Sequence, residues 1–194
     1  MNFLAHIALS GNEQEVAIGN FIADTILPKE RKLLTDKMMR GVTLHHAIDT
    51  FTDQHSSFLN TTLLARPILR KYAPVATDVF FDHFLALHFE EYYGRDLASF
   101  SKDFYLSIGS WQANLPERAQ ILVHYLLKND WLNMYKSKDG LHAILTQMSK
   151  RTRFESNLEK ASLVLNEHYQ EIEKDFRKIF PELMELSKSQ LNFD

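Results

Sequence analysis

Histidine and aspartate gather in the first half of this 194-residue chain, where six of the nine histidines precede residue 90. His45, Asp49 and Asp53 follow one another at intervals of four, so a helix would place all three on one face. One imidazole and two carboxylates offer the nitrogen and oxygen ligands that suit Mn²⁺, Mg²⁺, Fe²⁺ or Zn²⁺. The spacing therefore predicts a divalent-metal site.

A second cluster of the same residue types lies further along the chain. Asp78 and Asp82 share one helical face, His83 adjoins them, and aromatic residues flank the group. A carboxylate in such apolar surroundings is costly to bury unless a partner or a metal satisfies it. Taken singly, a His or Asp on such a helix usually lies on the solvated face or is hydrogen-bonded in the core, and Asp24 fits a local helix cap. Two clusters on separate helices favour a metal site.

The amino-acid composition argues against several kinds of site and partner. The chain has no cysteine, which excludes disulfides, thiolate metal sites and cysteine nucleophiles. Its net charge of −3 gives no general attraction to nucleic acid or to an anionic membrane. No run approaches 18 apolar residues, and the N-terminus lacks the pattern of a signal peptide. We therefore expect a cytoplasmic protein that spans no membrane and binds no nucleic acid.

The elements that must position these side chains are expected to be helices. Glycine (6) and proline (5) are scarce, no strand pattern occurs, and no linker divides the chain. The sequence predicts an all-α fold with a single helical domain over residues 1–194. Turns are expected at 11–12 and 139–140, and Gly41 is a candidate break. Helices are predicted over 2–9, 14–27, 29–58, 60–72, 75–93, 96–109, 141–150, 154–179 and 182–190, and from Pro116.

Four blocks, in order and at compatible spacing, resemble the acyl carrier protein phosphodiesterase family, also called acyl carrier protein hydrolases. Weaker matches continue through Trp131, Tyr135, residues 151–153 and Phe180-Pro181, so the resemblance spans nearly the whole chain. The blocks are MNFLAH (1–6), GNFIAD (19–24), GVTLHHAIDTFTD (41–53) and DVFFDHFL (78–85), the last followed by His88.

The resemblance implies both a fold and a reaction. The family is similar to the HD phosphohydrolases, helical proteins that hold divalent metals with His and Asp, which implies an HD-like helix bundle. It implies hydrolysis of holo-acyl carrier protein to the apo protein and 4′-phosphopantetheine, with Mn²⁺ as the usual metal. The ordinary HD pattern contains an adjacent His-Asp pair, whereas this chain has Asp82-His83 in the reverse order. The metal ligands are therefore assigned from the residues of the four matched blocks, and not from the HD pattern.

The matched blocks supply a set of residue roles. One or two metal ions would activate a water for attack on phosphorus. Catalytic roles are expected for Asp24, Asp49, Asp82 and His83. Asp53, Asp78 and His88 are expected to orient the ligands or to protonate the leaving group. The expected metal ligands are His6, Asp24, His45, Asp49, Asp82 and His83.

Acyl carrier protein, the partner that the resemblance implies, is acidic, so a basic docking surface is expected. A solvated helix face is the alternative for any such charge run. The leading candidates are Arg31, Lys32, Arg151 and Arg153. They belong to two basic groups, one of Lys29, Arg31, Lys32, Lys37 and Arg40, and one of Lys150, Arg151 and Arg153.

Two other functions fit the same residues. One is a metal-dependent phosphohydrolase that acts on a nucleotide or another small phosphodiester, for which the basic groups would have no role. The other is a helical binding module whose His and Asp side chains are structural or hold a metal without turnover. The number of metal ions and the oligomeric state stay open at this stage.

Overall fold

The computed structural model describes residues 1–191, and they contain helices and no strand, which confirms the all-α prediction. Five short 3₁₀-helices join the α-helices: η1 (Ala23–Thr25), η2 (Pro28–Leu33), η3 (Arg70–Tyr72), η4 (Gln112–Asn114) and η5 (Leu158–Lys160). The α-helices are α1 (Phe3–Ala8), α2 (Gln14–Ile22), α3 (Asp36–Gln54), α4 (Ser56–Leu69), α5 (Ala73–Leu87), α6 (Phe89–Tyr93), α7 (Leu97–Trp111), α8 (Glu117–Asn129), α9 (Trp131–Met134), α10 (Lys138–Arg151), α11 (Ala161–Glu167) and α12 (Tyr169–Leu191).

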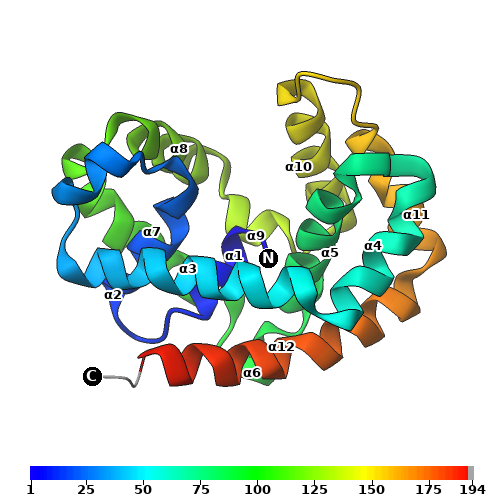
Figure 1. Ribbon diagram of the computed structural model, residues 1–194, viewed down its shortest axis with the longest axis horizontal. Coiled ribbons are helices and arrows are strands. Elements are labelled where there is room, and N and C mark those ends of the chain that lie inside the picture. The colour runs from blue at the N-terminus through cyan, green and yellow to red at the C-terminus, as the bar shows by residue number, and fades with distance from the viewer. Residues whose placement is uncertain (192–194) are drawn as a thin grey trace.

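The short helix α1 lies near the centre of the molecule. All its residues from Leu4 to Ala8 are buried, and it packs against α2 and α5. Figure 1 shows α3 passing in front of α1 and α12 running beneath, with α7 and α8 on one side and α4, α5 and α10 on the other. The buried apolar residues form one hydrophobic cluster. The helix that carries His6 is therefore held from several directions.

Helices α2 and α3 cross at unusually close range because a glycine lies on each side of the contact. A Cβ on Gly19 would lie 2.0 Å from the carbonyl oxygen of Met38, and one on Gly41 would lie 2.1 Å from that of Val16. Gly41 is buried inside α3, which continues past it, so the candidate break is wrong. Its lack of a side chain serves helix packing.

Several predicted helix boundaries are confirmed. Gly94 follows α6 in the left-handed conformation with φ 63°, as expected of a C-terminal glycine. Asp96 caps α7 by accepting a hydrogen bond from the backbone N–H of Ser99 at 2.9 Å. Pro74 lies in the first turn of α5, and Pro116 directly precedes α8. The backbone preferences of glycine and proline and the side-chain cap of Asp96 are local effects, which is why these boundaries could be predicted.

Other boundaries differ from the predictions. The predicted turn at 139–140 lies in the first turn of α10, because the hydroxyl of Ser137 caps that helix by accepting from the N–H of Gly140 at 3.0 Å. The predicted helix over 154–179 is divided among η5, α11 and the start of α12. Pro181 lies within α12 instead of ending it, because buried apolar residues on both sides, including Phe180 and Leu183, hold that helix against the core.

Among residues 1–191, no helix combines the length and the apolar character that a membrane crossing requires. A single domain over residues 1–194 and a cytoplasmic location stay predictions, and residues 192–194 lie outside the described part of the chain.

Candidate metal centre

A pocket of about 230 Å³ collects side chains from three segments that are far apart in sequence. His6 comes from α1, Asp24 from η1, and His45 and Asp49 from α3. We call this the histidine pocket. Its remaining lining residues are Met1, Asn2, Phe3, Asp53 and Asp78.

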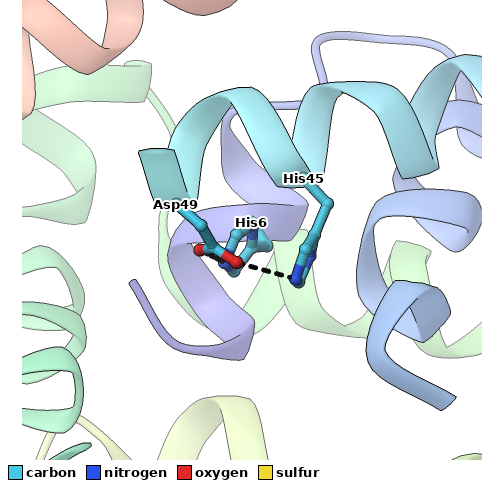
Figure 2. A group of neighbouring side chains, drawn as sticks. All are labelled: His6, His45 and Asp49. Carbon is cyan, nitrogen blue, oxygen red and sulfur yellow. Dashed lines mark ion pairs between the residues drawn. The ribbon is translucent and has the colours of Figure 1, made fainter. Parts of the chain in front are cut away.

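The carboxylate of Asp49 is directed toward the imidazoles of His6 and His45, as Figure 2 shows. Its Oδ1 is 3.2 Å from His6 Nε2, and its Oδ2 is 3.1 Å from His45 Nε2. The two rings stack with their centroids 4.0 Å apart. Asp24 Oδ1 lies 3.3 Å from His45 Nε2 on the open side of the pocket, where its side chain is 80% exposed. Two carboxylates and two ring nitrogens thus converge on one small volume.

Asn20, on the buried face of α2, orients both histidines. Its Oδ1 accepts a hydrogen bond from His6 Nδ1 at 2.9 Å, and its backbone carbonyl accepts one from His45 Nδ1, also at 2.9 Å. Its Nδ2 donates to the hydroxyl of Ser10 at 2.9 Å and to the carbonyl of His6 at 2.8 Å, which fixes the orientation of the amide. Protons held at Nδ1 leave each Nε2 directed toward the pocket.

The role of Asn20 was not predicted from the sequence. It lies in one of the four matched blocks and is fully buried between apolar residues of α2. A polar amide among buried apolar neighbours requires hydrogen-bond partners, and that requirement was the available signal. Met1, Asn2 and Phe3 were also given no role, although they line the pocket.

The charges of the two histidines differ. Burial lowers the pKa of His6 to about 4, although Asp49 opposes this, so the ring is neutral near pH 7. Burial also acts to lower the pKa of His45, but the carboxylates of Asp24 and Asp49 outweigh it and raise that pKa to about 9. Despite its own burial, Asp49 has a pKa well below the usual range, because both histidines contact it. The histidine pocket therefore stabilises a positive charge at His45 Nε2.

These groups fit a divalent cation. His6, His45 and Asp49 each offer a ligand atom, and these atoms lie within 4.8 Å of one another. His45 Nε2 is buried and makes no hydrogen bond of acceptable geometry to the described residues. A cation in place of its proton would contact the same carboxylates, and a mixed nitrogen and oxygen set suits Mn²⁺, Fe²⁺ or Zn²⁺.

Asp53 and Asp78 lie at the edge of this group. The carboxylate of Asp78 contacts the backbone amine of Met1 at 2.8 Å, and the same amine lies 3.9 Å from Asp49. Burial raises the pKa of Asp78, although the amine opposes that shift. Asp53 lines the pocket from the exposed side of α3. Both residues line the histidine pocket, so they lie near the atoms that they are expected to orient or to protonate.

Asp82, expected to bind metal, instead faces the first turn of α1. Its Oδ2 accepts a hydrogen bond from the N–H of Leu4 at 2.7 Å, and its Oδ1 accepts from Asn2 and Ala5, both at 3.3 Å. These N–H groups have no partner within α1, so a buried carboxylate satisfies them. Burial raises the pKa of Asp82 to about 7, against these hydrogen bonds. Asp82 thus holds α1, and with it His6, in place.

The structure does not bring His83 or His88 to the histidine pocket. The Nδ1 of His83 donates to the carbonyl of Tyr135 at 2.7 Å, and its ring packs against Tyr169. His88 contacts Glu173 of α12 at 2.7 Å and lies beside Arg177. His83 directly follows Asp82 on α5 and His88 directly follows the end of that helix, but neither side chain lines the histidine pocket.

The two basic groups lie in different surroundings. Lys29, Arg31 and Lys32 are exposed on η2, which follows Asp24 closely along the chain. Lys37 pairs with Glu13 at 2.7 Å, and Arg40 donates to the carbonyl of Leu191 at 3.0 Å. In the second group, the guanidinium of Arg151 lies over the ring of Tyr125, and that of Arg153 over Phe154.

Comparison with known proteins relates this site to one family. A family model described as acyl carrier protein phosphodiesterase matches residues 1–183. Curated relatives with that name include one from Pectobacterium atrosepticum, 28% identical over 191 residues that cover 98% of this chain and 99% of the relative. Another, from Klebsiella pneumoniae subsp. pneumoniae, is 29% identical over 191 residues, with coverage of 97% and 98%. No solved structure matches, so the likeness to HD phosphohydrolases stays a prediction.

Proposed function

The chain belongs to the acyl carrier protein phosphodiesterase family, and from this premise we propose that it hydrolyses holo-acyl carrier protein with the aid of a divalent metal, Mn²⁺ being the expected ion. The products would be apo-acyl carrier protein and 4′-phosphopantetheine. The chain is accordingly a phosphoric diester hydrolase. The observation that carries the proposal is the convergence of His6, His45, Asp24 and Asp49 in one pocket.

His6, His45 and Asp49 are the residues that we assign to the metal, with Asp24 as a fourth ligand from η1. A bound divalent ion supplies positive charge, which lowers the pKa of a water and attracts phosphate oxygens. Asn20 directs the two Nε2 atoms toward the pocket. Asp82 and His83, which the sequence assigned to the metal, are reassigned to positioning because their polar atoms bind backbone groups of α1 and of Tyr135.

The reaction transfers the phosphopantetheinyl group from the serine oxygen of the carrier protein to water. A water oxygen bonds to phosphorus and gives up one proton, the bond between phosphorus and the serine oxygen breaks, and the serine oxygen takes up a proton. Asp53 and Asp78 line the pocket, and we assign proton donation to this pair. The side chains of Asp24 and Asp53 lie at the exposed edge, where a large protein substrate can approach.

Mass spectrometry of holo-carrier protein after incubation with this protein and Mn²⁺ tests the proposal. We expect a mass decrease equal to the phosphopantetheinyl group, and no decrease after the metal is removed with a chelator. Asp49→Asn should lower the rate by more than about a hundredfold, because it removes the negative charge of an expected metal ligand that also contacts both histidines. Mn²⁺ should raise the melting temperature of the unaltered protein and not that of Asp49→Asn.

Asp103→Asn is the matched control, since Asp103 of α7 forms a surface ion pair with Arg95 and the change should leave both measurements unaffected. Intact holo-carrier protein after incubation with the unaltered protein and Mn²⁺, or full activity of Asp49→Asn, would contradict the proposal. A panel of nucleotides run in parallel separates this function from hydrolysis of a small phosphodiester.

A further inference from the structure

A second, largely apolar cavity of about 310 Å³ opens between α8, α9 and α10. We call it the Trp131 cavity. Leu122, Trp131, Ile144 and Met148 form much of its wall, and Val75 of α5 closes one side. Figure 1 shows α9 between α8 and α10. The volume is at the lower end of the range for small-molecule sites, which are mostly apolar with a few polar groups.

Two residues connect this cavity to the histidine pocket. Asn2 and Phe3 line both of them. The ring of Phe3 stacks on Trp131, with centroids 5.8 Å apart and planes 9° apart, and its other neighbour is Phe21. Asn2 is held by its own hydrogen bond to the N–H of Phe3 at 2.9 Å. A ligand whose phosphate lies near His6 can therefore continue past Phe3 into the cavity.

The charges around the histidine pocket indicate where the carrier protein and the pantetheine arm of the substrate would lie. The phosphate joins the carrier protein on one side and the pantetheine arm on the other. The exposed lysines and arginine of η2 follow Asp24 and suit an acidic protein. The cavity beyond Phe3 is lined by aromatic and aliphatic side chains with Gln147 and Arg151 among them. An arm of methyl groups and two amides matches this mixture.

We propose that the Trp131 cavity binds the pantetheine arm of the substrate, so that its phosphate lies in the histidine pocket and its thiol end lies toward Met148. This inference rests on the proposed function, since it assumes that pantetheine phosphodiesters are the substrate. It assigns Arg151 to the rim of the arm site, because this residue lines the cavity. Contacts with a remote part of the substrate would hold the phosphorus in place for reaction.

Met148→Trp tests the inference by filling the cavity, because Met148 is a partly buried wall residue of α10. Two Mn²⁺-dependent rates are compared, one for holo-carrier protein and one for bis(p-nitrophenyl) phosphate, which has no arm. We expect the ratio of kcat/KM for holo-carrier protein to that for the armless ester to fall by about tenfold or more. Val75→Phe, which fills the cavity from α5, provides a second variant if the first does not fold.

Leu163→Trp is the matched control, since Leu163 is 58% exposed on α11 and does not line the cavity. Calorimetric titration with 4′-phosphopantetheine and with inorganic phosphate, both with Mn²⁺, gives a second readout. The excess affinity for 4′-phosphopantetheine should disappear in Met148→Trp and persist in Leu163→Trp. An unchanged rate ratio and unchanged excess affinity in the folded variants would overturn the arm site. Failure of the unaltered protein to hydrolyse holo-carrier protein would instead overturn the proposed function.

Discussion

At the scale of single residues, the main feature of the site is that one amide serves two imidazoles. Asn20 accepts the Nδ1 protons of His6 and His45 through two different oxygens. The opposite nitrogen of each ring is then available in the pocket, beside Asp49. Residues that orient metal-binding histidines in this way affect metal affinity although they do not contact the metal.

Asn20→Ala is expected to weaken Mn²⁺ binding by about ten- to a hundredfold, because His6 loses the acceptor of its Nδ1 proton. Calorimetric titration with Mn²⁺ measures the change. Asn133→Ala is the control, since the amide of Asn133 donates to Asp130 at the surface and does not line the histidine pocket. Equal Mn²⁺ affinity in Asn20→Ala and the unaltered protein would show that other contacts orient the rings.

At the scale of elements, the site depends on how closely α2 and α3 approach each other. The backbone contact at Gly19 and Gly41 brings Asn20 of one helix to His45 of the other. Helix α1 is located separately, through the hydrogen bonds between Asp82 and its first N–H groups. Two distinct contacts between helices thus determine where His6 and His45 meet.

Gly41→Ala should separate α2 from α3, because the added Cβ would lie 2.1 Å from the carbonyl oxygen of Val16. We expect a loss of about 1–3 kcal/mol in the free energy of unfolding, measured with urea, together with weaker Mn²⁺ binding. Gly109→Ala in α7 is the control, because its Cβ would meet only Leu127 at 3.9 Å. That variant should be neutral or more stable by up to about 1 kcal/mol. Similar losses in both variants would contradict the packing argument.

At the scale of the whole molecule, two features adjoin the histidine pocket. The exposed basic residues of η2 follow Asp24 along the chain, and the Trp131 cavity shares Asn2 and Phe3 with the pocket. The second basic group, around Arg151, lies at the cavity and not at the exposed edge of the histidine pocket. Of the two predicted docking groups, the arrangement favours η2, because the serine that bears the phosphate must approach the pocket closely.

Reversing the charge of Lys29, Arg31 and Lys32 to Glu should lower kcat/KM for holo-carrier protein by about tenfold at low salt, because these charges attract an acidic partner. The difference should shrink as ionic strength rises, since exposed charges are screened. Lys150→Glu combined with Arg153→Glu is the control, and we expect it to change kcat/KM less than about twofold. A larger effect of the control pair would place the docking surface on the second basic group.

The sequence alone determined the helical class and one face of the site. His45 and Asp49 are four residues apart, and this spacing places them together on any helix. The matched blocks added His6 and Asp24, which spacing could not have joined to α3. The predicted helix ends at 93 and 96 also depend on nearby residues, since Gly94 and Asp96 act on helices within a few positions of them.

Only the tertiary structure decided which clusters meet. Asp78, Asp82 and His83 lie within two turns of α5, yet Asp78 lines the pocket, Asp82 binds the N-terminus of α1, and His83 binds Tyr135. Asn20 acquired its role because α2 packs on α3. The physical reason is one of range. Periodicity within a helix decides which side chains share a face, whereas packing against distant helices decides what that face contacts.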